Sequence, residues 1–145
     1  MLKDFLFKQG YTRTKLKLLK TNHFEIKATI NDVKGRFILD TGASNSCLDS
    51  SISENFKLNV INSDIKAAGA GAIDMQTQIS KKNILKIGKW KKEKVILILF
   101  NLHHVNTALS NHGANIVDGI IGADILKKGK AIIDYEKKYL YLKPL

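Results

Sequence analysis

The sequence predicts an all-β fold with one or two short helices. Apolar and polar residues alternate with a period of two through much of the chain, which is typical of strands with one buried face. Clusters of Gly, Asn and Asp separate these stretches at hairpin spacing, whereas stretches with helical periodicity are short and few. The 145 residues, 44% apolar and 26% charged, suit one soluble globular domain. We expect an N-terminal extension over residues 1–22, which could add a strand, and a single domain over 23–145.

The first strong element is a hairpin. Every second residue from Phe24 to Ile30 is apolar, which predicts a half-buried strand. Residues 31–35 form a turn cluster, and residues 36–39 return as the second strand. A further strand over residues 15–19 could pair ahead of this hairpin.

The middle of the chain predicts a short helix and a second hairpin. Residues 51–58 favour a helix, with Ser51 as N-cap and Glu54 in the capping-box position. Residues 64–80 are strand-like at both ends, and small, glycine-rich residues occupy positions 67–72 between them. Such a tip can bury little area, so we expect it to be mobile.

The last third of the chain adds two more hairpins. Residues 83–87 and 95–100 flank a turn over 88–93, and the second of these strands is apolar on both faces, which predicts the most central strand. A helical turn is expected near residues 105–109, and a short helix over 123–128 that ends at Gly129. The final hairpin has strands over 131–134 and 139–142 around a turn at 136–138.

The net charge of +11 is unevenly distributed. Residues 38–80 hold five acidic and two basic side chains, and residues 95–126 hold two acidic and none basic. These stretches sum to −5 and the rest of the chain to +16. The lysines predict a solvated surface. Nucleic-acid binding is the alternative, and the presence of only two arginines, Arg13 and Arg36, argues against it.

The one cysteine indicates a reducing compartment, and the lack of a long apolar run argues against a membrane span. Cys47 has no partner for an internal disulfide. The longest clean apolar run, Val95 to Phe100, is far shorter than the roughly 20 residues that span a bilayer. Residues 1–20 lack the apolar centre of a signal peptide. We therefore expect a cytoplasmic protein with no membrane partner.

The strongest local signal is the stretch over residues 37–44. An apolar strand leads into Asp40, followed by Thr41 and Gly42, so the aspartate is expected at the floor of a cleft. Gly42 allows the backbone to approach the carboxylate closely, and Ser44 could donate a hydrogen bond to it. As a bare tripeptide, Asp-Thr-Gly is equally compatible with an ordinary hairpin turn that carries an aspartate cap.

The order of the motifs resembles the retroviral-type aspartic proteases. After the Asp40 turn come the glycine-rich hairpin, the apolar pair Ile120–Ile121 with Gly122, a short helix and a final strand. The chain is similar, over residues 23–142, to the single-domain, retropepsin-like branch of the pepsin clan with its cellular and bacterial members. The resemblance implies a retropepsin-like acid-protease barrel.

The resemblance also implies roles for particular residues. Asp40 would be the catalytic aspartate, Thr41 would interlock with its copy across a dimer, and Ser44 would bond the outer carboxylate oxygen. Ala123 stands where viral enzymes carry an arginine. The remaining active-site support would come from Gly42, Ala43, Ile120, Ile121 and Gly122. A flap over the substrate would be formed by Ala68, Gly69, Ala70, Gly71, Ala72 and Ile73.

Peptide hydrolysis by an enzyme of this kind needs two carboxylates that share one proton, and the chain has one Asp-Thr-Gly. The resemblance therefore implies a homodimer that hydrolyses peptides or unfolded proteins, with water as the only co-reactant and neither metal nor cofactor. A catalytically silent peptide-binding or dimerisation module of the same fold is the alternative.

The two other acidic residues beside a motif are interpreted as structural. Asp118 is expected to be a turn former, and Asp124 is expected to be the N-cap of the short helix.

Three further features are interpreted as structural. His103, His104 and His112 are expected to be polar loop residues, since a metal site would need more ligands at suitable spacing. Cys47 is expected to be a buried small residue and not a nucleophile. Trp90 is expected in a hairpin turn, where it would shield its own strand.

Overall fold

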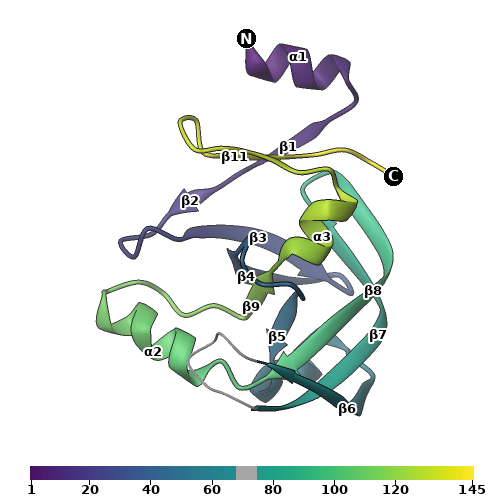
Figure 1. Cartoon of the computed structure of the whole chain (residues 1–145), viewed down its shortest axis with the longest axis vertical. Helices are drawn as coiled ribbons and strands as arrows, with labels where there is room; N and C mark the ends of the chain where they lie inside the picture. The colour runs from purple at the N-terminus through teal and green to yellow at the C-terminus, as the bar shows by residue number, and fades with distance from the viewer. Residues whose placement is uncertain (68–74) are drawn as a thin grey trace.

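Eight strands form the larger of two sheets in the computed structural model of the chain, which describes residues 1–67 and 75–145 (Figure 1). These strands are β2 (Lys17–Leu18), β3 (Phe24–Ile30), β4 (Val33–Leu39), β5 (Cys47–Asp49), β6 (Val60–Ala67), β7 (Met75–Ile87), β8 (Trp90–Phe100) and β9 (Gly119–Ile121). Their order is β2-β3-β4-β9-β5-β8-β7-β6, and β3 also pairs with β7. This extra pairing closes the sheet into a barrel, so the predicted all-β, retropepsin-like barrel class is confirmed.

The hairpin of β3 and β4 is continuous, from the pair Phe24–Leu39 to the pair Ile30–Val33. Only Asn31 and Asp32 form its turn, with φ values of 52° and 67°. Two central residues with positive φ define a type I′ turn, whose twist matches that of the strands. The turn is thus shorter than the predicted one, and the alternation predicted for β3 is confirmed because Phe24, Ile26, Ala28 and Ile30 are all buried.

The main core fills the barrel, and two predictions about its strands are wrong. Trp90 is the first residue of β8 and 1% exposed, and its Nε1 donates to the Lys143 carbonyl at 3.1 Å. It therefore anchors the C-terminus and does not lie in a turn. Strand β8 is not the central strand: β9 and β5 hold that position in the sheet order, and Ile96 on β8 is 47% exposed.

A second apolar cluster lies outside the barrel, against helix α2 (His103–Asn111). It joins Ile38 and Ile120 of the sheet to Leu102, Leu109 and Val117 around the helix. The helix is longer than the predicted turn because Leu109 is buried and Val105 packs against the same cluster, which gives the helix an apolar face.

The two ends of the chain meet in a three-stranded sheet (Figure 1). Its order is β1 (Thr12–Lys15), β11 (Tyr139–Leu142), β10 (Ile132–Asp134), which agrees with the predicted final hairpin. The strand expected over residues 15–19 is divided: β1 pairs with β11, and β2 pairs with β3. Helix α1 (Leu2–Lys8), which was not predicted, lies beyond β1 and buries only Leu6.

Two short helices follow strands β5 and β9. Helix α3 (Ala123–Lys128) ends at Gly129, as predicted. Residues 51–58 do not form the predicted Ser51-capped helix. Instead η1 (Ser50–Phe56) is a 3₁₀ helix with Asp49 as N-cap, whose carboxylate accepts from Ser51 N at 3.1 Å. Within residues 1–67 and 75–145, no helix is long and apolar enough to cross a membrane.

Candidate active site

The topology of three short strands brings two distant motifs together. Strand β9 runs parallel to β4, with Ile38 beside Ile120, and antiparallel to β5, with Cys47 beside Ile120. Strands β4 and β5 follow each other in the sequence, yet β9 lies between them. Residues 40–46 must therefore pass over the end of β9, and this crossing carries the Asp-Thr-Gly turn.

Asp40 is held at the crossing by backbone groups. Its N–H donates to the Ile121 carbonyl at 2.9 Å, which extends the β4–β9 ladder by one residue. Gly42 N donates to Asp40 Oδ1 at 2.9 Å, and Ala43 N donates to the Asp40 carbonyl at 3.2 Å. The half-buried carboxylate is thus oriented by its own turn. A Cβ at position 42 would lie 3.3 Å from Asp40 Oδ1, which favours glycine there.

The apolar pair and its glycine lie directly beside this turn. Ala123 N donates to the Ala43 carbonyl at 2.7 Å. A Cβ on Gly122 would lie 2.5 Å from that carbonyl oxygen and 3.2 Å from Ala43 Cβ. Because backbone fills the space, only glycine fits position 122. Ile120 and Ile121 are both buried on either side of the sheet, in the second cluster and the main core respectively.

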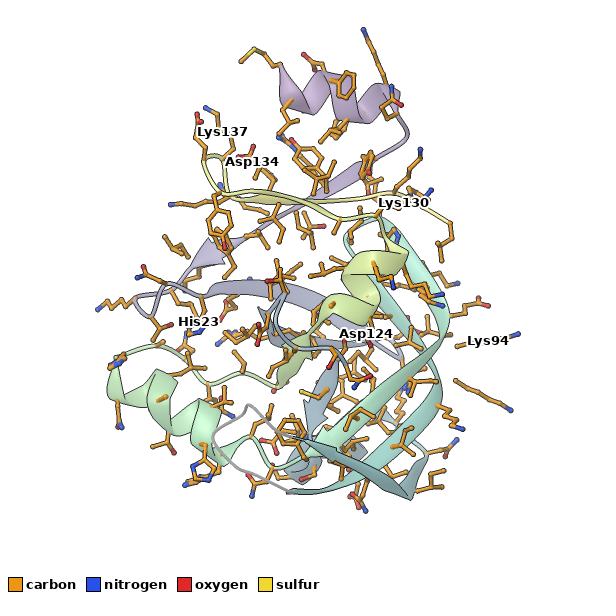
Figure 2. The ribbon with its side chains drawn as sticks, in the orientation of Figure 1. His23, Lys94, Asp124, Lys130, Asp134 and Lys137 are labelled. Atoms are coloured by element: carbon orange, nitrogen blue, oxygen red, sulfur yellow. The ribbon has the colours of Figure 1, made fainter. Side chains whose placement is uncertain are left out.

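Ser46 and Asp124 fasten the crossing to helix α3. Ser46 is fully buried; its N–H donates to both Asp124 carboxylate oxygens at 3.0 Å, and its hydroxyl donates to Asp124 Oδ1 at 2.7 Å. The same Ser46 Oγ accepts from Gly122 N at 2.8 Å. Figure 2 labels Asp124 at the end of α3 that adjoins β9. These four hydrogen bonds connect the Asp40 loop, the Gly122 turn and the helix.

The expected N-cap role of Asp124 is therefore wrong. The N-cap of α3 is Gly122, with no side-chain cap hydrogen bond, and Asp124 lies in the first turn with its carboxylate turned to Ser46. Asp118 accepts from Arg36 N at 2.9 Å through Oδ2, and its own N–H donates to the Arg36 carbonyl at 2.7 Å. Both carboxylates are thus engaged by backbone N–H groups.

Thr41, Ser44 and the flap are the remaining predicted site residues. Thr41 and Ser44 are exposed in the single chain, and neither side chain makes a hydrogen bond to any described residue. The predicted flap, residues 68–73, lies outside the described residues. Sequence reasoning missed Ser46, although a serine directly before the buried pair Cys47–Leu48 was a signal, because a buried hydroxyl needs a partner.

Cys47 and the histidines are the other side chains that were weighed for chemistry. Burial raises the pKa of the Cys47 thiol to about 12, so the thiol is protonated at neutral pH and is a poor nucleophile. It is 3% exposed, which confirms the buried small residue that was expected. His103 and His104 lie on α2. Across the described ranges, no three His, Cys, Asp or Glu side chains gather to hold a metal.

Solved structures of retropepsin-like aspartic proteases share this fold. A retropepsin-like aspartic protease from Rickettsia conorii aligns with a TM-score of 0.61 at 19% identity, over 91% of this chain and 89% of that one. The EIAV protease, complexed with an inhibitor, aligns with a TM-score of 0.55 at 20% identity, over 76% and 90%. The retroviral protease-like domain of Ddi1 from Leishmania major gives 0.55 at 19%, over 91% and 90%.

The closed barrel and the inserted strand β9 therefore define a retropepsin-like fold, as the motif order predicted. A family model described as aspartyl protease matches residues 26–125, from β3 into α3. The chain belongs to this aspartyl protease family. No curated protein sequence matches it.

Proposed function

We propose that the protein is an aspartic endopeptidase that acts as a homodimer, with the Asp40 carboxylate of each chain in one site. The observation that carries this proposal is the Asp40 turn. Its carboxylate accepts a backbone N–H from Gly42 while the loop is tied to the Gly122 turn and α3. Such an arrangement holds a carboxylate at a fixed place before substrate arrives, which catalysis requires.

The proposed reaction uses the two carboxylates in different protonation states. Two adjacent carboxylates cannot both ionise, so the pair holds one shared proton. The ionised Asp40 takes a proton from water, which attacks the peptide carbonyl, and the protonated Asp40 donates to the carbonyl oxygen, giving a tetrahedral diol. The C–N bond then breaks as the nitrogen takes the proton that came from water, and one hydroxyl of the diol returns its proton to the other Asp40. The products are an amine and a carboxylic acid, and the pair again holds one shared proton. Because each chain has one Asp-Thr-Gly, the second carboxylate comes from a second copy across a two-fold axis. Thr41 and Ser44, exposed in the single chain, are then available to contacts across the dimer.

The substrate class is a peptide or an unfolded protein in an extended conformation. An extended segment can pair through its backbone, which leaves specificity to side-chain pockets. Residues 68–73 are the proposed flap above it, and Ala43 with residues 120–122 supports the site below. A cytoplasmic location, with neither nucleic-acid nor membrane partner, is part of the same proposal.

The first test compares wild-type protein and Asp40→Asn on an unfolded, fluorescently labelled protein, from mildly acid to neutral pH. We expect wild type to cleave it and Asp40→Asn to lose at least about 10³-fold in rate, because general acid–base catalysis by this carboxylate is removed. Thermal unfolding of both proteins checks that the fold is retained. Activity that survives in the folded variant would refute the mechanism, and no cleavage by either protein would favour the catalytically silent binding module.

Mixing the two proteins tests the dimer separately from the chemistry. Asp40→Asn is added in equal amount to a fixed quantity of wild type and allowed to exchange subunits. If each site needs two Asp40 carboxylates, mixed dimers are inactive and activity falls to about half. Activity that does not change after exchange would mean that one chain is sufficient.

A further inference from the structure

A basic groove lies on the outer face of strands β3 and β4, where they meet β7. It is open to solvent and has a volume of about 710 Å³. Four cationic side chains line it, whereas Asp118 is its only acidic residue; the four are Lys27, Lys34, Arg36 and Lys86. This size exceeds that of a single ion and suits a chain segment or a larger molecule.

Strand register explains why these cations gather. Lys27 lies opposite Arg36, and Thr29 lies opposite Lys34 on one side and Lys86 on the other. Alternation places them on the face opposite to the buried Phe24–Ile30 set. Like charges directly across an antiparallel pair destabilise a sheet, so the Lys27–Arg36 pair does not contribute to the stability of the fold.

The acidic groups near the groove neutralise only half of these cations. Arg36 Nε lies 3.6 Å from Oε1 of Glu25, which is 4% exposed, and Lys86 Nζ lies 3.1 Å from Asp32 Oδ1. Asp118 Oδ2 accepts from a backbone N–H. Lys27 and Lys34 make no ion pair within residues 1–67 and 75–145, and Thr29 Oγ1 has no hydrogen-bond partner there. The Thr29 hydroxyl is buried beneath the groove, so what the groove presents to solvent is two uncompensated ammonium groups.

We propose that this groove binds an acidic segment of the polypeptide substrate, an inference that rests on the proposed endopeptidase function. Flexible lysines suit carboxylates spaced along a chain, and Ile116 at the rim, 59% exposed, offers an apolar contact. Single-stranded nucleic acid requires aromatic side chains on which bases stack, and no aromatic residue lines the groove.

Strand β4 connects the groove to the Asp40 turn. Lys34 stands six residues before Asp40 in the sequence, which corresponds to about 20 Å of extended strand. A substrate that reaches both places therefore carries its acidic segment roughly six or more residues from the scissile bond. The charge distribution agrees, since the stretches around the motifs sum to −5 and the rest of the chain to +16. The groove would bind one part of the substrate and the Asp40 site another.

Binding to the full-length Asp40→Asn protein tests the groove without any need for cleavage. The probe is a fluorescein-labelled twelve-residue peptide of alternating Glu and Ser, and its control has Gln for Glu. Anisotropy titrations at low salt compare Lys27→Gln/Lys34→Gln with Lys3→Gln/Lys8→Gln, which removes two charges from the outlying helix α1. We expect the acidic peptide to bind at least about tenfold more tightly than its control. We also expect a loss of about tenfold in the groove variant and less than about twofold in the α1 variant.

Equal losses in the two variants, or equal binding of the two peptides, would overturn the proposal. Tighter binding of an oligothymidylate of the same charge, with the same loss in the groove variant, would replace it by a nucleic-acid site. With wild-type protein, an acidic segment placed six residues from a cleavable bond is expected to lower KM at unchanged kcat, and only when Lys27 and Lys34 are present. The binding result stands whether or not wild type cleaves, so the two proposals fail separately.

Discussion

The polar groups near the two ends of β4 differ in how firmly they are held. At the carboxyl end, Asp40 is bonded through its N–H, its carbonyl and its carboxylate, and the following loop is fastened by Ser46 to Asp124. At the amino end, the ammonium groups of Lys27 and Lys34 are exposed and make no ion pair with a described residue. The same pair of strands thus supports one fixed carboxylate and one loosely held group of charges.

This difference matches what each end is proposed to do. A reacting carboxylate must be held to a fraction of an ångström, and hydrogen bonds from backbone and buried side chains achieve that. Charges that attract a distant segment act over several ångströms and tolerate motion. Substitutions at the carboxyl end should therefore cost much stability, and substitutions at the amino end should cost little.

The largest effect on stability is expected for Gly122→Ala. The new Cβ would meet the Ala43 carbonyl oxygen at 2.5 Å, and backbone cannot move aside without opening the crossing. We expect a loss of about 3 kcal/mol in the free energy of unfolding, measured by urea denaturation with an unchanged m-value.

Gly129→Ala is the matched control for Gly122→Ala. Its Cβ would also meet an atom at 2.5 Å, but that atom is Leu142 Cδ2, at the end of a flexible side chain. We expect a loss below about 1 kcal/mol. Equal losses for the two substitutions would mean that the crossing is no more rigid than the end of α3.

The next effect compares two serines of one loop. Ser46→Ala leaves the buried Gly122 N–H without its acceptor and removes a donor to Asp124, so we expect a loss of about 2 kcal/mol. Ser44→Ala removes an exposed hydroxyl and should change stability by less than about 0.5 kcal/mol. Denaturation midpoints of the two variants measure this difference. A larger loss for Ser44 would show that the loop is held by contacts of that residue and not by Ser46.

The elements predicted correctly depend on residues close in sequence. The alternation from Phe24 to Ile30 gave β3 its buried face, and Gly129 ended α3 at the predicted position. In both cases the information lies within one strand or one short turn. The proximity of Gly122 to the Asp40 turn is different, since it was predicted from the resemblance in motif order and not from a local pattern.

The elements that sequence reasoning missed depend on contacts between distant segments. Ser46 and Asp124 are 78 residues apart, and no local pattern distinguishes an aspartate that caps its helix from one that binds a serine. Strand β8 is apolar but not central, because it pairs with β5 on one side and with β7 on the other, which makes it the third strand from the β6 edge. Glu25 alternates with the buried apolar residues of β3, yet it is itself 4% exposed and pairs with Arg36 on the neighbouring strand.

The smallest predicted effect has the opposite sign and lies at the amino end of β4. Lys27→Gln removes a cation directly across from Arg36, so we expect stability to rise by about 0.3 kcal/mol at low salt. In roughly 1 M salt, where the Debye length is about 3 Å, this gain should vanish. Lys81→Gln, at another exposed lysine, is the control and should change nothing at either salt concentration. A gain confined to Lys27 at low salt would mean that this charge weakens the sheet, as expected of a side chain kept for binding. A loss of stability in Lys27→Gln would show instead that Lys27 helps to hold the strands together, and the contrast between the two ends of β4 would then fail.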